Sequence, residues 1–251
     1  REEGLQIVTG AQVVRVSNKS SKEIEVVANL DGKEQPFKAQ KLLVATGREP
    51  NTDNAGLDKV GVQLDEHGFV KVNDELQTNI SNIWAAGDVI GRQTDSQPAT
   101  PVGAHDGVIV AKTALAGSHQ KVDHRVIPRS IFTDPQVAVV GQTDEEAVGS
   151  GIRCWCGTIP LELVPRAGAT HQTNGIAKMV INRETQEVVG VSLVMPNAGE
   201  VIHEAAMALR FRAKLEDYID MIHVYPTMAE ALKVAAMSYF KDPAKLSCCA
   251  E

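Results

Sequence analysis

Two adjacent cysteines near the end of the printed sequence, Cys248 and Cys249, carry its most reactive side chains. A thiolate is the form of cysteine that attacks electrophiles and binds metals, and exposed thiols are more reactive than buried ones. Free cysteine is usually buried, but a residue this close to a chain end is rarely covered by its own domain. Because two soft thiolates suit a soft, thiophilic cation, the pair is a candidate metal site.

A second pair of cysteines, Cys154 and Cys156, is separated by a single tryptophan. Side chains at alternate positions of a strand point to the same face, so both sulfurs are expected on one side. We interpret this pair as packing in a core or an interface, with a second thiol relay as the alternative. Four cysteines among 251 residues do not make a disulfide scaffold.

Small residues followed by an acid, Ala86, Gly87 and Asp88, form a candidate binding turn. Residues 83–87 are predicted as a strand that ends at this turn. Small residues let the backbone approach a ligand closely, and a carboxylate there can accept a hydrogen bond from a ligand hydroxyl group. The alternative role of Asp88 is that of a cap at the end of the strand.

The first third of the chain is rich in valine and isoleucine and predicts strands. They are expected over residues 5–9, 11–16, 23–30 and 34–39. Asp31 and Gly32 are a hairpin turn signal between the last two. A continuous apolar run over residues 41–47 predicts a buried strand, and its terminal glycine indicates a close backbone neighbour or ligand.

The remaining sequence predicts a helix over residues 101–116, a polar boundary over 117–124 and a second domain beyond it. Strands are expected there over residues 129–132, 136–140, 153–159, 175–181 and 188–195. Helices are expected after two capping boxes, Thr143 with Glu146 and Thr227 with Glu230, and over the amphipathic stretch 197–212. Strands and helices without strict alternation predict an α+β domain.

Composition excludes several classes of partner. The net charge is −7, which argues against a nucleic-acid or anionic membrane surface. No apolar run approaches the roughly 18 residues of a membrane span, and the charged opening residues do not resemble a signal peptide. We therefore expect a cytoplasmic protein, and the absence of an initiator methionine indicates that the printed sequence begins within a longer one.

Three stretches together resemble the flavin-dependent pyridine nucleotide–disulfide oxidoreductase family. They are Leu-Leu-Val-Ala-Thr-Gly-Arg at 42–48 with Pro-Asn at 50–51, Thr-Asn-Ile-Ser-Asn-Ile-Trp-Ala-Ala-Gly-Asp at 78–88, and Tyr-Pro-Thr-Met-Ala-Glu at 225–230. The ending Lys-Leu-Ser-Cys-Cys-Ala-Glu at 245–251 is similar to the mercuric reductases of that family. The resemblance extends over the chain from Gly4 onward.

The resemblance implies α/β flavin- and nucleotide-binding segments followed by an α+β dimerisation domain with an antiparallel sheet and helices. Residues 1–47 would end the nicotinamide-binding domain, and 48–120 would form the second segment of the FAD-binding domain. Residues 121–240 would form the dimerisation domain, and 241–251 a flexible cysteine-bearing tail. The family is homodimeric, so a homodimer is expected.

The resemblance also implies site residues for the flavin. Asp88 would accept a hydrogen bond from a ribityl hydroxyl, with Ala86 and Gly87 beside it. Thr46 and Gly47 match the segment where the chain crosses from the nicotinamide domain back to the flavin domain. They therefore indicate the domain boundary and are also candidates for contact with the flavin.

Tyr225 departs from the pattern of the disulfide-reducing relatives, in which a histidine at this position protonates a departing thiolate. In mercuric reductases a phenol here donates a hydrogen bond to a thiolate or lies against the bound metal, with packing at a domain edge as the alternative. His223 is a candidate surrogate acid, but an ordinary polar contact is the favoured interpretation. The capping box already accounts for Glu230.

The implied reaction is the NADPH-dependent reduction of Hg(II) to Hg(0) through FAD and cysteine thiolates. Cys248 and Cys249 would take Hg(II) from thiol donors and pass it to an inner cysteine pair beside the flavin of the other subunit. No cysteine precedes Cys154, and no glycine-rich dinucleotide fingerprint is present. The inner pair and most of the NADPH site are therefore expected before Arg1.

Other functions stay open at this point. One is a different flavin disulfide reductase, similar to dihydrolipoamide dehydrogenase. Another is a non-catalytic, dimerising metal-binding module. For the terminal cysteines alone, the alternatives are a prenylation box and general soft-metal or redox sensing.

Overall fold

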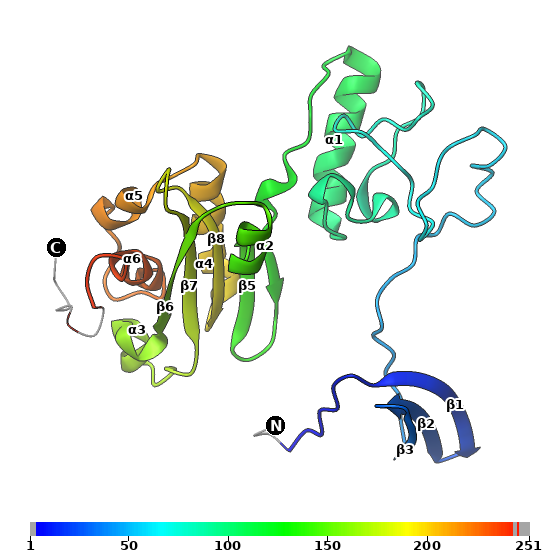
Figure 1. The fold of residues 1–251 in the computed structure, drawn as a ribbon, viewed down its shortest axis with the longest axis horizontal. Helices are drawn as coiled ribbons and strands as arrows, with labels where there is room; N and C mark the ends of the chain where they lie inside the picture. The colour runs from blue at the N-terminus through cyan, green and yellow to red at the C-terminus, as the bar shows by residue number, and fades with distance from the viewer. Residues whose placement is uncertain (1–3, 243–244, 246–251) are drawn as a thin grey trace. The chain divides into compact units, whose positions relative to one another are not determined.

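The computed structural model describes residues 4–242 and 245 of the chain. The chain divides into two compact units, residues 1–49 and residues 50–251. Figure 1 shows the elements of each unit. No helix in the described part of the chain is long and apolar enough to cross a membrane.

The first unit is an antiparallel three-stranded sheet with the order β1-β2-β3. Its strands are β1 Gln12–Ser20, β2 Glu23–Leu30 and β3 Lys33–Ala39. Asp31 and Gly32 join the last two with φ angles of 51° and 83°. Positive φ at both central residues is the backbone of a tight hairpin turn whose twist matches the strands, so the predicted hairpin is confirmed.

Two strands predicted for the first unit are wrong, because residues 5–9 and 41–47 have no strand structure. Both runs are exposed, and Leu43 has 89% of its surface accessible. A continuous apolar strand is stable when neighbouring strands cover it. In the described part of the chain no strand pairs with either run.

The second unit begins with a stretch that has little regular structure apart from η1 Gly87–Ile90, η2 Gln93–Asp95 and α1 Thr100–Ala116. The helix predicted over 101–116 is confirmed, with proline in its first turn and Gly117 in the left-handed region at its end. The strand predicted over 83–87 is wrong. These residues make a single bridge, from Trp84 to Gln77, and Gly87 then turns at φ 77° into η1.

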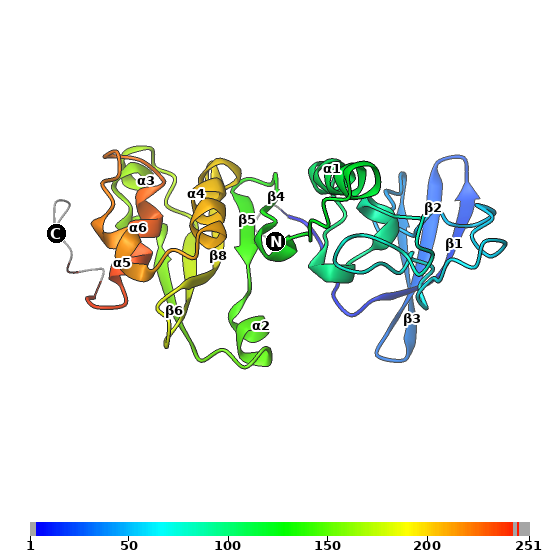
Figure 2. The ribbon, with the colours of Figure 1, turned by 90° about the horizontal axis from the view of Figure 1, so that it is seen from above.

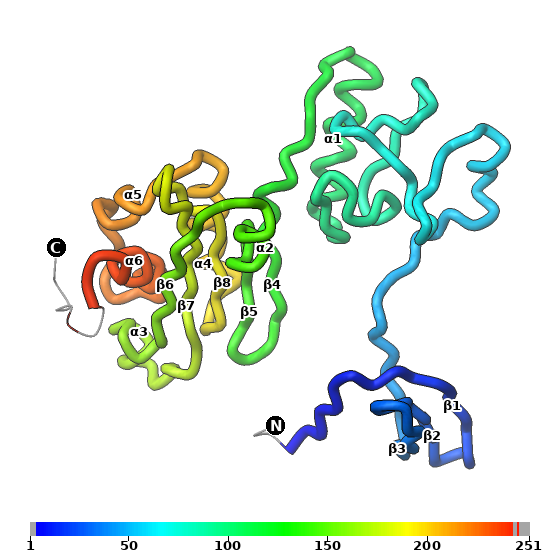
Figure 3. Tube along the Cα trace, in the orientation of Figure 1, coloured from blue at the N-terminus to red at the C-terminus, as the bar shows by residue number. Residues whose placement is uncertain are grey.

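A five-stranded antiparallel sheet with the order β4-β5-β8-β7-β6 forms the rest of the second unit. Its strands are β4 Arg129–Ile131, β5 Gln136–Gly141, β6 Cys154–Pro160, β7 Ile176–Asn182 and β8 Val188–Met195. All five predicted strands of this domain are confirmed to within a few residues. Figure 3 shows the single stretch, residues 117–128, by which the chain passes from α1 to this sheet.

Helices cover the five-stranded sheet. They are α2 Asp144–Gly149, α3 Pro165–Ala169, α4 Ala198–Arg210, α5 Leu215–Asp220 and α6 Glu230–Met237. Helix α4 packs on β5 and β8, and α6 packs on β6 and β7 (Figure 2). Their apolar residues and those of the strands form one core cluster, in which Leu193, Ile202 and Leu232 are almost completely buried.

The two predicted capping boxes have different outcomes. The box before α2 is confirmed, since Thr143 N donates to Glu146 Oε2 at 2.8 Å and Glu146 N donates to Thr143 Oγ1 at 3.2 Å. Before α6 only half of the box forms. Thr227 N donates to Glu230 Oε2 at 2.9 Å, but the buried Thr227 Oγ1 has no partner in the described residues. The reason is that the helix begins at Glu230 itself, two residues later than the box requires.

Candidate functional site

The turn that bears Asp88 is held by a close contact between two glycines. Gly87 has φ 77°, and a Cβ at this position would lie 3.3 Å from Gly103 Cα in the first turns of α1. A Cβ at Gly103 would lie 3.2 Å from Gly87 Cα. Side chains at either position would push α1 away from η1, so both glycines are needed for the approach. The turn presents Asp88 at the surface.

Thr46 and Gly47 belong to the first unit, where both are exposed. Gly47 has φ 108°, a backbone conformation that side chains disfavour. Their assignment to a cofactor site stays a prediction.

Tyr225 follows α5, and 53% of its surface is exposed. It precedes Pro226 through a cis peptide bond. Asp88 and Tyr225 thus come from different parts of the second unit, one before α1 and the other between α5 and α6. The third predicted group, Cys248 and Cys249, lies outside the described residues.

His223 is bound to helix α4. Its side chain is 4% exposed, its Nε2 lies 3.1 Å from Glu204 Oε1, and its Nδ1 lies 3.3 Å from the carbonyl oxygen of Met221. The hydrogen bond to Glu204 raises the pKa of His223, while burial acts in the opposite direction. The predicted polar contact is confirmed, and both ring nitrogens are engaged in it.

The raised pKa of His223 predicts a pH-dependent contribution to stability. The stabilisation is complete below the ordinary histidine value of about 6.5 and is lost as pH rises through the higher folded value. We therefore expect Glu204→Gln to lower Tm most at pH 5–6 and progressively less toward pH 8. Thermal unfolding across this pH range measures the effect, with Glu200→Gln on the exposed side of α4 as the control. A Tm difference that does not vary with pH would contradict this prediction.

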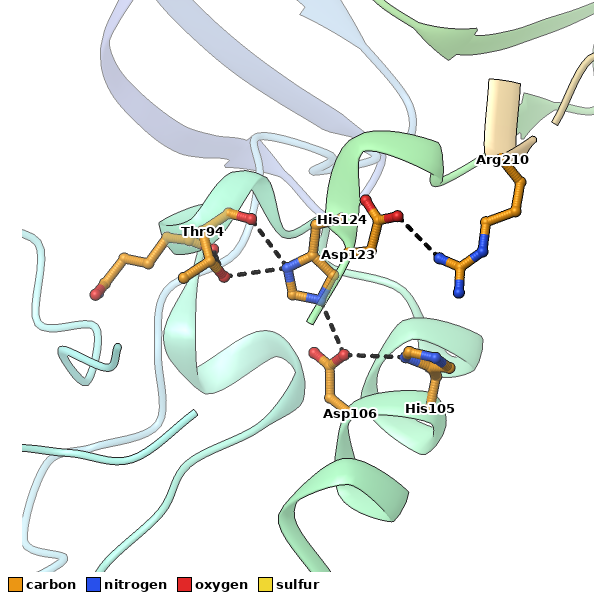
Figure 4. Close-up of polar contacts among 7 residues, drawn as sticks. Thr94, His105, Asp106, Asp123, His124 and Arg210 are labelled. Atoms are coloured by element: carbon orange, nitrogen blue, oxygen red, sulfur yellow. Dashed lines mark hydrogen bonds and ion pairs between the residues drawn. The ribbon is translucent and has the colours of Figure 1, made fainter. Parts of the chain in front are cut away.

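A buried polar pair, Asp106 and His124, joins α1 to the segment that precedes the five-stranded sheet (Figure 4). Asp106 of α1 is fully buried, and His124 lies in the short helix η3 His124–Val126 with 2% of its side chain exposed. Asp106 Oδ1 lies 2.9 Å from His124 Nε2. The other ring nitrogen of His124 lies 3.0 Å from both the carbonyl oxygen and the hydroxyl of Thr94. These contacts connect α1, η2 and η3.

Sequence reasoning missed this pair, although it left a signal. The buried residues of α1 are Val102, Asp106, Ile109 and Thr113. Their spacing of four, three and four places a carboxylate on the buried stripe of the helix. Buried carboxylates are paired with few exceptions, so the sequence already indicated that Asp106 has a polar partner elsewhere in the chain.

Charged groups at the surface surround the buried pair. Asp123 lies 2.9 Å from Arg125 Nε and 2.9 Å from Arg210 Nη1 on α4, as Figure 4 shows for the second contact. The hydrogen bond from Arg125 lowers the pKa of Asp123. Exposed ion pairs of this kind contribute little to stability. These surface contacts are therefore expected to matter less than the buried pair when one partner is removed.

A cavity of about 730 Å³ lies beside the junction. Its walls include His124 and residues of β5, β7 and β8, with both arginines and acids among them. Neither Asp88 nor Tyr225 lines it. Within the part of the chain that the structure describes, no group of three or more histidine, cysteine or acidic side chains is placed to hold a metal ion.

Two family models match the chain. The model described as pyridine nucleotide-disulphide oxidoreductase matches residues 1–112, and that of the dimerisation domain of the same family matches residues 127–236. The chain is 41% identical to a mercuric reductase of Staphylococcus aureus, over 99% of this chain and 45% of that protein. It is 36% identical to the mitochondrial dihydrolipoyl dehydrogenase of Pisum sativum, over 96% of this chain and 48% of that protein.

Solved structures agree with this relationship. LpdA from Mycobacterium tuberculosis superposes with a TM-score of 0.84 and 25% identity, over 96% of this chain and 50% of the other. The HOCl-induced flavoprotein disulfide reductase RclA from Escherichia coli, in a Cu(II) complex, gives a TM-score of 0.80 and 29% identity, over 96% and 52%. The chain spans about half the length of the curated relatives that it matches.

Proposed function

This chain belongs to the pyridine nucleotide-disulphide oxidoreductase family, and from that membership we propose that the complete protein reduces Hg(II) to Hg(0). The electrons come from NADPH through FAD, and the metal is held by cysteine thiolates. The domain division is proposed as residues 1–47, 48–120, 121–240 and 241–251, and the active form as a homodimer. Similarity to mercuric reductases over almost the whole chain supports this choice.

Tyr225 is the observation that carries the proposal. Disulfide reduction needs an acid that protonates a departing thiolate, and a phenol with a pKa near 10 is a poor acid for that step at neutral pH. A metal product requires no such proton. The hydroxyl of this exposed side chain can instead donate a hydrogen bond to a thiolate that holds the metal.

The residues around Asp88 fit a flavin. The tight contact between Gly87 and Gly103 fixes the turn at the start of η1, and this turn holds the Asp88 carboxylate at the surface, where it can accept a hydrogen bond from a ligand hydroxyl. We propose that Asp88 accepts a hydrogen bond from a ribityl hydroxyl of FAD and that Ala86 and Gly87 contact FAD through their backbone. Thr46 and Gly47 are the second proposed contact with FAD. When bound, FAD supplies a carrier that accepts a hydride from NADPH and passes on two electrons.

Cys248 and Cys249 would take the metal by thiol exchange. Each new sulfur–mercury bond forms as a donor thiolate leaves, and the proton of the attacking cysteine goes to that donor. Hg(II) therefore passes between sulfur pairs without release into water. The homodimer matters because the tail of one subunit serves the site of the other.

Separate assays with each candidate substrate test the proposal against its main alternative, a disulfide reductase. NADPH oxidation by the complete enzyme is measured with Hg(II) in excess small thiol, and separately with lipoamide and glutathione disulfide. We expect oxidation that depends on Hg(II) and little oxidation with either disulfide. Rapid disulfide reduction without Hg(II) turnover would favour a dihydrolipoyl dehydrogenase activity, which the 36% identity to the pea enzyme keeps as the second candidate.

Removal of the Tyr225 hydroxyl is expected to slow metal reduction. In the complete enzyme, Tyr225→Phe should lower kcat for Hg(II) about 10-fold, the low end of the effect of removing a group that supports a metal ligand. Flavin reduction by NADPH should be unchanged, as measured by stopped-flow absorbance. Val224→Ala, at an exposed neighbouring position, serves as the control. An unaltered kcat in Tyr225→Phe would show that the Tyr225 hydroxyl has no role in metal reduction.

A further inference from the structure

The two cysteines of β6 place their sulfurs on one face of an edge strand. β6 is the last strand in the sheet order, and Cys154 and Cys156 occupy alternate positions in it. Trp155 between them points the other way and packs against the core, where its ring centroid lies 4.8 Å from that of Tyr239. The cysteine pair therefore lies on the face away from this core. Of the two packing interpretations, burial in this core does not apply to the pair, and packing in an interface stays a prediction.

The residue spacing along a strand favours an ion between the two cysteines over a disulfide. Both cysteines are free and half-buried. Two residues along a strand span about 6.4–6.8 Å. Disulfides prefer Cα separations of about 5.5–6 Å and rarely exceed about 6.8 Å. An ion held between the sulfurs thus fits the extended strand more readily than a direct sulfur–sulfur bond.

Charged groups from two other elements face the pair. Lys178 of β7 lies 2.6 Å from Asp144 of α2, measured from Nζ to Oδ1, and α2 packs beside β6. Burial raises the pKa of Cys156 to about 11, with further contributions from Cys154 and Asp144, while Lys178 acts in the opposite direction. At neutral pH Cys156 is therefore a thiol, and a bound metal must displace its proton.

We propose that Cys154 and Cys156 form a two-sulfur binding site for a soft cation of the Hg(II) type, separate from Cys248 and Cys249. Soft thiolates select soft metals, and a pair on one strand face provides two ligands without a third. On binding, each sulfur–hydrogen bond breaks as a sulfur–metal bond forms, two protons leave to solvent, and no electrons are transferred. The inference concerns binding alone and stands apart from the proposed reductase activity.

A chain without the terminal thiols tests the site. The 251-residue chain carrying Cys248→Ala and Cys249→Ala is titrated with mercuric chloride in the presence of a small monothiol competitor. We expect about one Hg(II) per chain and loss of both remaining thiols to a thiol reagent. In a parallel titration without the monothiol, where no leaving thiolate takes up the protons, about two protons should be released per ion. Trp155 lies between the two cysteines in the sequence, so partial quenching of the tryptophan fluorescence of the chain is a further expected signature.

Single-serine variants in the same background decide whether the two sulfurs act together. Cys154→Ser and Cys156→Ser should each weaken binding by about 100-fold or more, because the second contact is intramolecular in the pair. Thr158→Ala, at the next position on the same face, should bind as the parent does, and circular dichroism verifies folding of every variant. Binding that is absent in the parent, or equally tight in either single variant, would overturn the proposal.

Discussion

Replacing Cys248 and Cys249 together with alanine is expected to lower kcat/KM for thiol-bound Hg(II) about 100-fold in the complete enzyme. A tethered thiol pair presents the metal at a high effective concentration, and avidity of this kind is typically worth two orders of magnitude or more. Without it, the metal must leave its donor and reach the inner site in one bimolecular step. NADPH oxidation at a series of small-thiol concentrations measures the loss.

Ser247→Ala is the matched control for the terminal cysteines, because it changes the same segment without removing a sulfur. Its kcat/KM should equal that of the parent enzyme. The alanine variant should still accept electrons from NADPH at the normal rate, which confines the defect to metal delivery. Equal kcat/KM for parent and variant at every thiol concentration would exclude the delivery role.

His124→Ala is expected to destabilise the second unit by about 2–3 kcal/mol, the cost of leaving a buried polar group without its hydrogen-bond partner. The substitution leaves the fully buried Asp106 carboxylate without its imidazole, and Asp106 Oδ2 already has no hydrogen-bond partner in the described residues. The contacts of the imidazole with Thr94 are lost as well. Denaturant unfolding of the 251-residue chain measures the shift in midpoint.

Two further variants separate the buried pair from general packing. Asp106→Asn keeps a hydrogen-bonding group of nearly the same shape and should cost less than His124→Ala. His105→Ala removes an exposed ring that lies 3.4 Å from Asp106 and should cost about 0.5 kcal/mol or less. In a double-mutant cycle, Asp106→Ala with His124→Ala should be less destabilising than the sum of the single changes. An additive result would show that the two side chains are not coupled.

Local signals in the sequence determined much of the fold. Asp31 and Gly32 form their hairpin because the turn type depends on the conformational freedom of those two residues. Thr143 and Glu146 form their capping box because both partners lie within one helical turn. Strands β5, β6, β7 and β8 appeared in the apolar pattern because each one contributes side chains to the same core. The motifs were also sufficient to indicate the family.

The tertiary structure alone decided which runs became strands and which polar groups met. Residues 41–47 have the composition of a buried strand but lack described neighbours, since pairing is a property of two segments. Asp106 and His124 are 18 residues apart, and Glu204 and His223 are 19 apart, so no local pattern joins them. Alternation predicted one face for Cys154 and Cys156, but only the packing of α6 on β6 showed which face turns away from the core.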